Sequence, residues 1–347
     1  MCVIGDFAWD VLIRTNSELL RGGDTFGEVM LTPGGSAANV AVWARRAGMT
    51  TRFIGKIGRD RFGKLAEEDL DREKVEAHFV ETDAHLTGSV AVFVDHTGER
   101  SMVSGHGADF YLLPQELPRE VIRRSRHLHL TAWSFFIDPP RAAARSAALL
   151  AQASGATLSF DPGSFQMIGE MGVAQFLAVT QDLGIDILLP NKEEGSMLTG
   201  GLTDNDEIAA RLAELFPKAL IMLKLDADGA LVWENGHGTH IPAGTNNLVD
   251  ATGAGDSFAG GFLAHYLAHG DAVAAAVSSA WLPWQQRARA LAAAGGRQRV
   301  QHAGRAHRLR RHQRGDRDVG SLPRQAGVRS RHVDHLHRRP RRRGLAA

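Results

Sequence analysis

Short apolar runs alternate with amphipathic stretches over residues 1–280, and the two patterns predict different elements. Buried strands are expected at the apolar runs Val3–Gly5, Arg52–Gly55, His127–Leu130, Thr157–Phe160, Ile185–Leu189 and Leu220–Lys224. Helices are expected at the amphipathic stretches Ala37–Ala47, Gly63–Glu73, Arg141–Ala153, Val173–Thr180 and Asp206–Phe216. This alternation predicts an α/β fold with a mostly parallel sheet covered by helices.

Two segments break the alternation. Residues 11–31 and 88–104 are extended in pattern and half apolar, and the second contains a turn signal at residues 95–98. Extended segments inserted between strand–helix units could pair as a small extra sheet over the site and act as a lid. An ordinary hairpin at the edge of the main sheet would give the same pattern, so both arrangements stay open.

The composition changes after about Ala280. Residues 281–347 contain 18 Arg, no Lys and three acids, a net charge of +15, whereas residues 1–280 carry −14. We therefore predict one domain over residues 1–280, followed by an atypical Arg- and His-rich tail over 281–347. Such a tail could be a disordered segment that binds nucleic acid. We favour a GC-rich gene translated out of frame, because such frames tend to yield Arg, Ala, Gly, Pro and His.

Several protein classes are disfavoured by features that the sequence lacks. No run approaches 18 consecutive apolar residues, which argues against a transmembrane helix and a membrane partner. The N-terminal MCVIGDFAWD has no basic segment before a long apolar one, which argues against a secretory signal peptide. Cys2 is the single cysteine, in keeping with a reducing compartment, and we expect the cytoplasm. P-loop, dinucleotide-binding and zinc-ligand spacings are absent from the sequence.

The strongest chemical signal is the segment Asp250–Asp256, DATGAGD, which precedes a helix-like stretch. The backbone N–H groups of Gly253, Ala254 and Gly255 can converge on one point, where a helix N-terminus adds roughly half a positive charge. Such an anion hole suits phosphate oxygens, and Asp256 at its edge can accept a proton from an attacking hydroxyl. A glycine turn that only caps a helix is the alternative.

A second signal is the run GGSAANVA. Gly34 and Gly35 allow the backbone to approach a ligand closely, and Asn39 follows them by about one helical turn. A glycine loop with Ser36 as the helix N-cap would have the same sequence.

A third signal follows the apolar run IDILLP, where Asn191 and Glu194 are three positions apart. If they share one helix face, both side chains can reach one metal-bound water or phosphate. The pattern N-x-x-E is common, and by itself it fits an ordinary solvated helix start.

Together, D-x-T-G-A-G-D followed by SFAGGF, and GGSAAN upstream, resemble the two signatures of the ribokinase-like (PfkB) carbohydrate kinase family. The resemblance covers roughly residues 2–280. It implies a three-layer α/β/α fold with a small β lid, and ATP-dependent phosphorylation of a sugar hydroxyl with Mg²⁺ and K⁺ as the expected ions. It also implies a homodimer formed through the lid. Simple sugars such as ribose are the first expected substrates and nucleosides the second.

The resemblance also implies roles for individual residues, of which the first is Asp256 as the base that deprotonates the acceptor hydroxyl. By the resemblance, Gly253, Ala254 and Gly255 form the anion hole, and Asp10, Gly34, Gly35 and Asn39 bind the sugar. The nucleotide is expected at Asn191, Lys224 and Gly229, Mg²⁺ at Glu194, and a monovalent cation at Asp250 and Thr252.

The sequence departs from the family pattern at three places. Asp226 stands where members usually have a glycine near the nucleotide. The loop 161–163 lacks the Asn and Arg that often follow in fructokinase and ketodeoxygluconate kinase relatives, which disfavours those two substrates. After Ala280 relatives continue with Ala-rich helices that wall the adenine pocket, whereas this chain continues with Trp281 and then arginines. A catalytically impaired kinase-fold product, or a kinase-like module bound to nucleic acid, is therefore the alternative.

Overall fold

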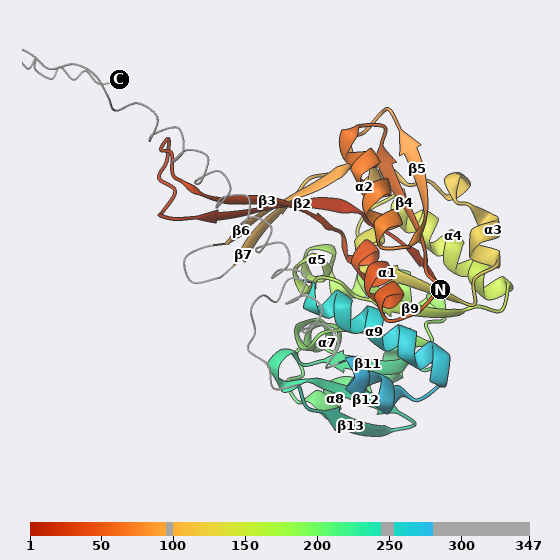
Figure 1. Cartoon of the computed structure of the whole chain (residues 1–347). Helices are drawn as coiled ribbons and strands as arrows, with labels where there is room; N and C mark the ends of the chain where they lie inside the picture. The colour runs from red at the N-terminus through yellow and green to blue at the C-terminus, as the bar shows by residue number, and fades with distance from the viewer. Residues whose placement is uncertain (95–99, 244–252, 280–347) are drawn as a thin grey trace, which may run out of the picture. The chain divides into compact units, whose positions relative to one another are not determined.

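The computed structural model describes residues 1–94, 100–243 and 253–279, and it is built around one nine-stranded sheet (Figure 1). The strands lie in the order β13-β12-β11-β10-β9-β8-β1-β4-β5. The seven strands from β11 to β5 are parallel, and β12 and β13 complete the sheet antiparallel at one edge. Their bounds are β1 Cys2–Ile4, β4 Arg52–Gly58, β5 Glu76–Thr82, β8 His127–Thr131, β9 Thr157–Asp161, β10 Ile187–Leu188, β11 Leu220–Lys224, β12 Ala230–Glu234 and β13 His237–Ile241.

Helices cover both faces of this sheet because successive strand residues point to opposite sides. One apolar core contains Val3 and Phe53 together with α1 Ser36–Arg46, α2 Arg61–Arg72 and α9 Ala254–His269. The other contains Cys2 and Ile4 together with helices from the middle of the chain. These helices are α3 Arg119–Arg123, α4 Pro140–Ala153, α5 Phe165–Met171, α6 Val173–Thr180, α7 Lys192–Leu198 and α8 Asn205–Leu215. The result is the three-layer α/β/α architecture that the sequence predicted.

The predicted strands and helices are all present, with differences only at their ends. α2 begins at Arg61 rather than Gly63, because the carboxylate of Asp60 accepts a hydrogen bond of 2.8 Å from the Gly63 N–H and so caps the helix. Strands β5, β12 and β13 and the short helices α3 and α5 were not predicted. Helix α5 begins after Ser164, whose hydroxyl accepts from the Met167 N–H.

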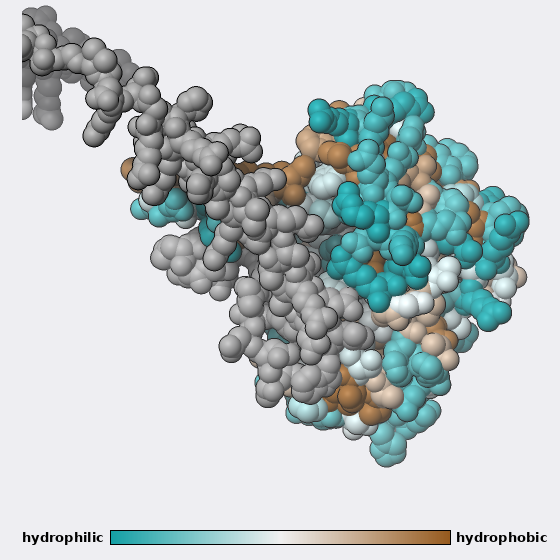
Figure 2. All heavy atoms as spheres, viewed as in Figure 1, coloured by the Kyte–Doolittle hydropathy of each residue, from teal (hydrophilic) through white to brown (hydrophobic). Residues whose placement is uncertain are grey.

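The two extended segments form a second sheet, which we call the arm. It contains β2 Ala8–Thr15, β3 Gly27–Gly34, β6 Gly88–Val94 and β7 Arg100–Ser104, in the order β3-β2-β6-β7. The segments therefore pair with each other, through parallel β2 and β6, and not with an edge of the main sheet. Figure 1 shows the arm extending away from the helices, and Figure 2 shows both hydrophobic and hydrophilic surface on the parts of it that are in view. The predicted turn at residues 95–98 lies outside the described residues.

The parallel strands bring their carboxyl ends to one edge of the sheet, where ligands of open α/β sheets bind. Asp6, Thr131, Asp161, Asn191 and Lys224 end or closely follow β1, β8, β9, β10 and β11. This edge carries the candidate site. In the described part of the chain, none of the helices has the length and apolar character needed to cross a membrane.

Candidate active site

The predicted anion hole lies at the N-terminus of α9. Gly253 is the N-cap and adopts the left-handed conformation, with φ of 67°, that glycine allows without strain. Gly255 is exposed, and a Cβ built on it would meet only the Nζ of Lys224, at 3.6 Å, among the described residues. The Lys224 ammonium therefore lies close to the first turn of this helix, whose N–H groups have no partner within the helix. Asp250 and Thr252, the predicted monovalent-cation ligands, lie outside the described residues.

Helix α9 is held against α1 by a close approach of the two backbones (Figure 1). A Cβ on Gly260 would come within 2.8 Å of the Ala44 nitrogen and of the Val40 oxygen. Only a residue without a side chain permits this crossing. The crossing brings residues from the start of the chain beside the first turn of α9.

Asp256 receives two hydrogen bonds from α1. The Ser36 hydroxyl donates to Oδ1 and the Asn39 amide donates to Oδ2, each at 2.8 Å. Burial raises the pKa of Asp256 to about 6, while the bonds from Asn39 and Ser36 act in the opposite direction. At neutral pH the group is an oriented carboxylate with more affinity for a proton than an exposed aspartate, as a general base requires.

Ser36 is a residue whose role the sequence did not reveal. The N-cap of α1 is Gly35, and the carboxylate of Asp6 accepts from the Ser36 N–H at 2.7 Å and from the Ala37 N–H at 3.3 Å. The interpretation of Ser36 as the N-cap is therefore wrong. Because Asp6 satisfies the first helical N–H groups, the Ser36 hydroxyl is available to Asp256.

Asp10, Gly34 and Gly35 lie together where β2 and β3 leave the main domain. A Cβ on Gly34 would overlap the Asp10 carboxylate at 2.5–2.6 Å, so the glycine provides the space that this side chain occupies. Gly35 has φ of 91°, and a Cβ there would lie 2.6 Å from the Asp6 carbonyl oxygen. The structure thus brings Asp10 and both glycines to the start of α1, the helix that carries Asn39.

Asn191 and Glu194 bind each other in a capping box at the start of α7. The Asn191 oxygen accepts from the Glu194 N–H at 2.7 Å, and the Glu194 carboxylate accepts from the Asn191 N–H at 2.9 Å. Asn191 is the N-cap and is not on the helix face that the sequence suggested. Glu194 is buried, and burial followed by the neighbouring Asp161 raises its pKa to about 7.

Lys224 forms a buried ion pair with Asp161, a residue that the sequence singled out only as part of a loop. The Lys224 Nζ lies 2.6 Å from the Asp161 Oδ2, so the pair joins the ends of β9 and β11. Burial alone would lower the pKa of Lys224, but Asp161, then Glu194 and Asp256, raise it. Lys224 therefore carries its charge at neutral pH, within electrostatic reach of three carboxylates.

Gly229 has a structural role that is visible without any ligand. Its φ is 100°, and a Cβ would lie 2.0 Å from the Ile241 carbonyl oxygen. The turn between β11 and β12 therefore needs a glycine here. Asp226, the departure from the family pattern, is exposed, as a carboxylate near a phosphate site should be.

Two histidines lie under the site on β8. The Nε2 of His127 and the Nδ1 of His129 both contact the Ser159 hydroxyl, at 2.7 and 2.8 Å. Burial lowers the pKa of His129 to about 4 and that of His127 well below its usual value. Both side chains are therefore neutral at pH 7 and belong to the polar interior of the sheet.

The charges at this edge fit a divalent cation held mainly by phosphate and water. Asp161, Glu194 and Asp256 supply three carboxyl groups around the ammonium of Lys224. Within residues 1–94, 100–243 and 253–279, no three His, Cys, Asp or Glu side chains are grouped so that they alone could hold a metal. Mg²⁺ commonly keeps several waters and takes one or two carboxylates plus substrate phosphates, and the buried Glu194 suits that arrangement.

Known proteins resemble this chain over most of its length. The model of the pfkB family carbohydrate kinases matches residues 1–283. A fructokinase from Escherichia coli is 32% identical over 264 residues, which cover 75% of this chain and 82% of that protein. An ATP-dependent ribose-1-phosphate kinase from Halopiger xanaduensis is 32% identical over 274 residues, 77% of this chain and 84% of that protein.

Solved structures give the same fold. An adenosine kinase from Sinorhizobium meliloti superposes with a TM-score of 0.72 at 23% identity, covering 80% of this chain and 90% of the other. A putative ribokinase II from E. coli, in complex with ATP and Mg²⁺, gives a TM-score of 0.68 at 24% identity, covering 79% and 88%. At this identity the likeness establishes the fold alone. With the family model matching most of the chain, the resemblance drawn from the sequence is confirmed: the chain belongs to the pfkB family of carbohydrate kinases.

Proposed function

We propose that this chain transfers the γ-phosphoryl group of ATP to a hydroxyl of a small sugar, with Asp256 as the general base. The observation that carries the proposal is the state of Asp256: partly buried at the anion hole, held by two donors at 2.8 Å, with a pKa of about 6. A carboxylate that is both oriented and moderately basic is what proton removal from an alcohol at neutral pH requires.

The reaction follows from the arrangement of the site. Asp256 accepts the proton of the acceptor hydroxyl, the freed oxygen attacks the γ-phosphorus, and the bond from that phosphorus to the bridging oxygen of ADP breaks. The N–H groups of Gly253, Ala254 and Gly255 would stabilise the charge on the phosphoryl oxygens, and Lys224 borders the same space. Mg²⁺, organised near Glu194, would neutralise further charge on the phosphates.

The acceptor would bind between the arm and the start of α1. Asp10 and Asn39 offer a carboxylate and an amide for sugar hydroxyls, and the backbone of Gly34 and Gly35 lies beside them. Closure of the arm over this position would exclude water and so limit hydrolysis of ATP. In this proposal Asn191 and Gly229 lie on the nucleotide side, and the chain acts in the cytoplasm.

The arm also supplies the surface for a homodimer. Its strands and their connection expose large apolar side chains, among them Phe26 at 89%, Val29 at 68% and Val103 at 65%. Apolar surface of this kind favours association with a second copy of the chain. Sedimentation analysis should show a dimer that Val29→Lys converts to monomer, and a monomeric wild-type chain would refute the interface.

The activity is tested by measuring ADP release with ATP, Mg²⁺ and either K⁺ or Na⁺, against a panel of sugars and nucleosides. The panel includes fructose, ribose, ribose 1-phosphate and adenosine, because relatives and structural neighbours carry those names. Asp256→Asn should abolish acceptor-dependent release. Asp271→Asn is the matched control, since Asp271 caps the following helical turn and Asn preserves that role.

A second candidate is a product with impaired activity. The family match ends at residue 283, close to the change in composition after Ala280. If the gene is out of frame there, another frame should restore an alternating α/β pattern, and the restored chain should release ADP faster than this one. If no frame restores it and truncation at 280 abolishes binding to unrelated DNA sequences, the tail is a nucleic-acid-binding segment instead.

A further inference from the structure

A buried ion pair stands beside the anion hole. The Lys224 side chain is 13% exposed and the Asp161 side chain 7% exposed, and their charged atoms are 2.6 Å apart. The second oxygen of Asp161 accepts from the Gly163 N–H at 3.1 Å, which fixes the carboxylate on its own loop. Asp161 is thus a rigid acceptor at the end of β9, and Lys224 reaches it from the end of β11.

The position of the ammonium group is unusual for a pair that only stabilises the fold. The Lys224 Nζ lies 3.6 Å from the point where a Cβ on Gly255 would stand, so it is close to the predicted anion hole. It also acts electrostatically on Asp256 and Glu194. Buried ion pairs contribute little net stability compared with apolar packing, so a pair at this position calls for another explanation.

A lysine side chain has a flexible stem of four carbons, and fixing its conformation when a ligand binds costs conformational entropy, which weakens binding. A partner that holds the ammonium in place beforehand removes most of that cost. Asp161 holds the Lys224 ammonium near Gly255, and no atom of Asp161 lies within 4 Å of the point where a Cβ on Gly255 would stand.

We propose that Asp161 is a positioning residue that holds the ammonium of Lys224 at the anion hole, where it meets the transferred phosphoryl group. The inference rests on the proposed function and deepens it: Asp161 acts through Lys224 and not on the substrate or the metal. Lys224 then contributes to transition-state charge stabilisation as well as to nucleotide binding.

The test is a double-mutant cycle with Asp161→Asn, Lys224→Met and the double variant. Asp161→Asn keeps the shape and one acceptor oxygen but removes the charge, and it should lower kcat/KM for ATP by about tenfold. Lys224→Met removes the ammonium and should lower kcat/KM by about a hundredfold. In the Lys224→Met background the second change should cost nothing further, because Asp161 then has no ammonium to position.

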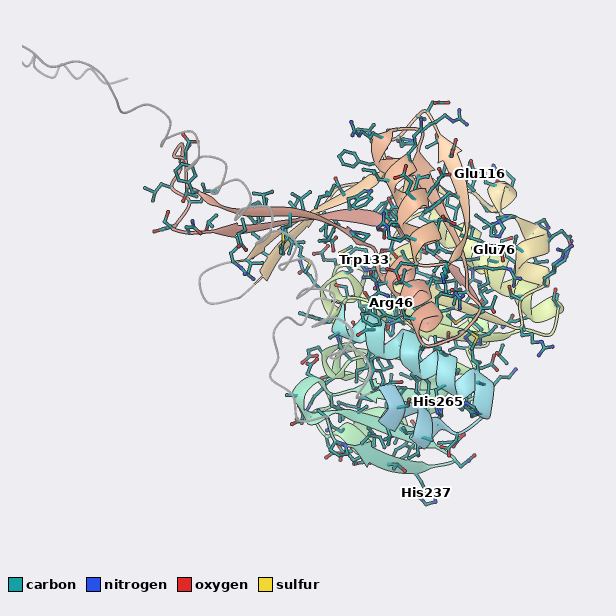
Figure 3. The ribbon with its side chains drawn as sticks, in the orientation of Figure 1. Arg46, Glu76, Glu116, Trp133, His237 and His265 are labelled. Carbon is teal, nitrogen blue, oxygen red and sulfur yellow. The ribbon has the colours of Figure 1, made fainter. Side chains whose placement is uncertain are left out.

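The control is Glu116→Gln, which removes the charge from a partly buried pair, between Glu116 (Figure 3) and Lys56 at 2.7 Å, outside the site. It should lower the melting temperature and leave KM for ATP unchanged. Nucleotide binding, measured by calorimetry without any acceptor, gives a readout independent of turnover, and it should weaken in Asp161→Asn.

Two results overturn the inference. If Asp161→Asn costs the same in the wild-type and Lys224→Met backgrounds, Asp161 acts directly on the metal or the substrate, and the positioning role is refuted while the kinase stands. If the wild-type chain neither binds ATP nor releases ADP with any acceptor, both the proposed function and this inference fail.

Discussion

Replacing Ser36 by Ala should change the pKa of Asp256, the base of the proposed reaction, while Asp256 itself is kept. The variant loses the 2.8 Å bond from the Ser36 hydroxyl to Asp256 and keeps the bond from Asn39. Both bonds stabilise the ionised carboxylate, so removing one should raise the pKa of Asp256 above its present value of about 6.

The size of this change can be estimated from the hydrogen bond. A bond to a charged group contributes about 1.5–3 kcal/mol, and part of it persists when the carboxyl is protonated. Since one pKa unit corresponds to about 1.4 kcal/mol, we expect the pKa to rise by about one unit. The rate relative to wild type should therefore fall most at pH 6 and below, by up to about tenfold, and recover above about pH 8, where the carboxylate forms again.

The assay is the pH profile of kcat/KM for ADP release between pH 5 and 9. Its acid limb should move to higher pH in Ser36→Ala. Ser125→Ala is the matched control, because the Ser125 hydroxyl donates to a backbone carbonyl and makes no contact with the site. An acid limb that stays in place while the rate falls equally at every pH would mean that Asp256 is not the group whose ionisation limits the rate.

Three further changes test the fold around the site. Gly260→Ala places a Cβ 2.8 Å from the Ala44 nitrogen, so the free energy of unfolding in urea should fall by about 1–3 kcal/mol; no change would refute the close crossing. Gly229→Ala should lower the free energy of unfolding by about 3 kcal/mol or more, because φ is positive and the new Cβ would overlap the Ile241 oxygen. A higher KM for ATP with unchanged stability would instead make Gly229 purely a ligand contact. His129→Asn should reduce the loss of stability between pH 7 and 5 by about 2 kcal/mol, since a histidine with a pKa of about 4 stabilises the fold above pH 6.5 and loses that effect as the pH falls toward 4. The raised carboxyl pKa values act in the opposite sense, so wild type and variant are compared at both pH values, and equal losses would refute the assignment.

The periodicity of the sequence predicted the six parallel strands β1, β4, β8, β9, β10 and β11 of the main sheet and the long helices beside them, but not β5, β12 and β13 or the short helices α3 and α5. Strands such as His127–Thr131 are buried on both faces, so their apolar or neutral character survives in the sequence as a continuous run. The arm was harder, because its strands are half exposed and their partners lie far apart in the chain. The parallel pairing of β2 with β6 follows from where the main domain places Ala8 and Gly88, and no local pattern records it.

In the candidate site, too, some residue roles could be predicted from the sequence and others could not. The placement of Gly253 at the start of a helix was predictable, because the glycines of this segment and the helix-like run after it are adjacent in the sequence. The contribution of Ser36 was not, because it depends on the crossing of α1 and α9. The pattern of Asn191 and Glu194 could have been interpreted as a capping box from spacing alone, since an N-cap residue with Glu three positions later is its usual signature.

The crossing of α1 and α9 joins positions 220 residues apart, and that separation affects folding as well as chemistry. Contacts so distant in sequence close large loops and form late. A refolding chain can therefore recover most of its sheet and helices while Asp256 still lacks the donors that set its proton affinity. Recovery of activity should therefore lag behind recovery of secondary structure. The acid limb of the pH–rate profile then reports whether the contact between α1 and α9 has formed.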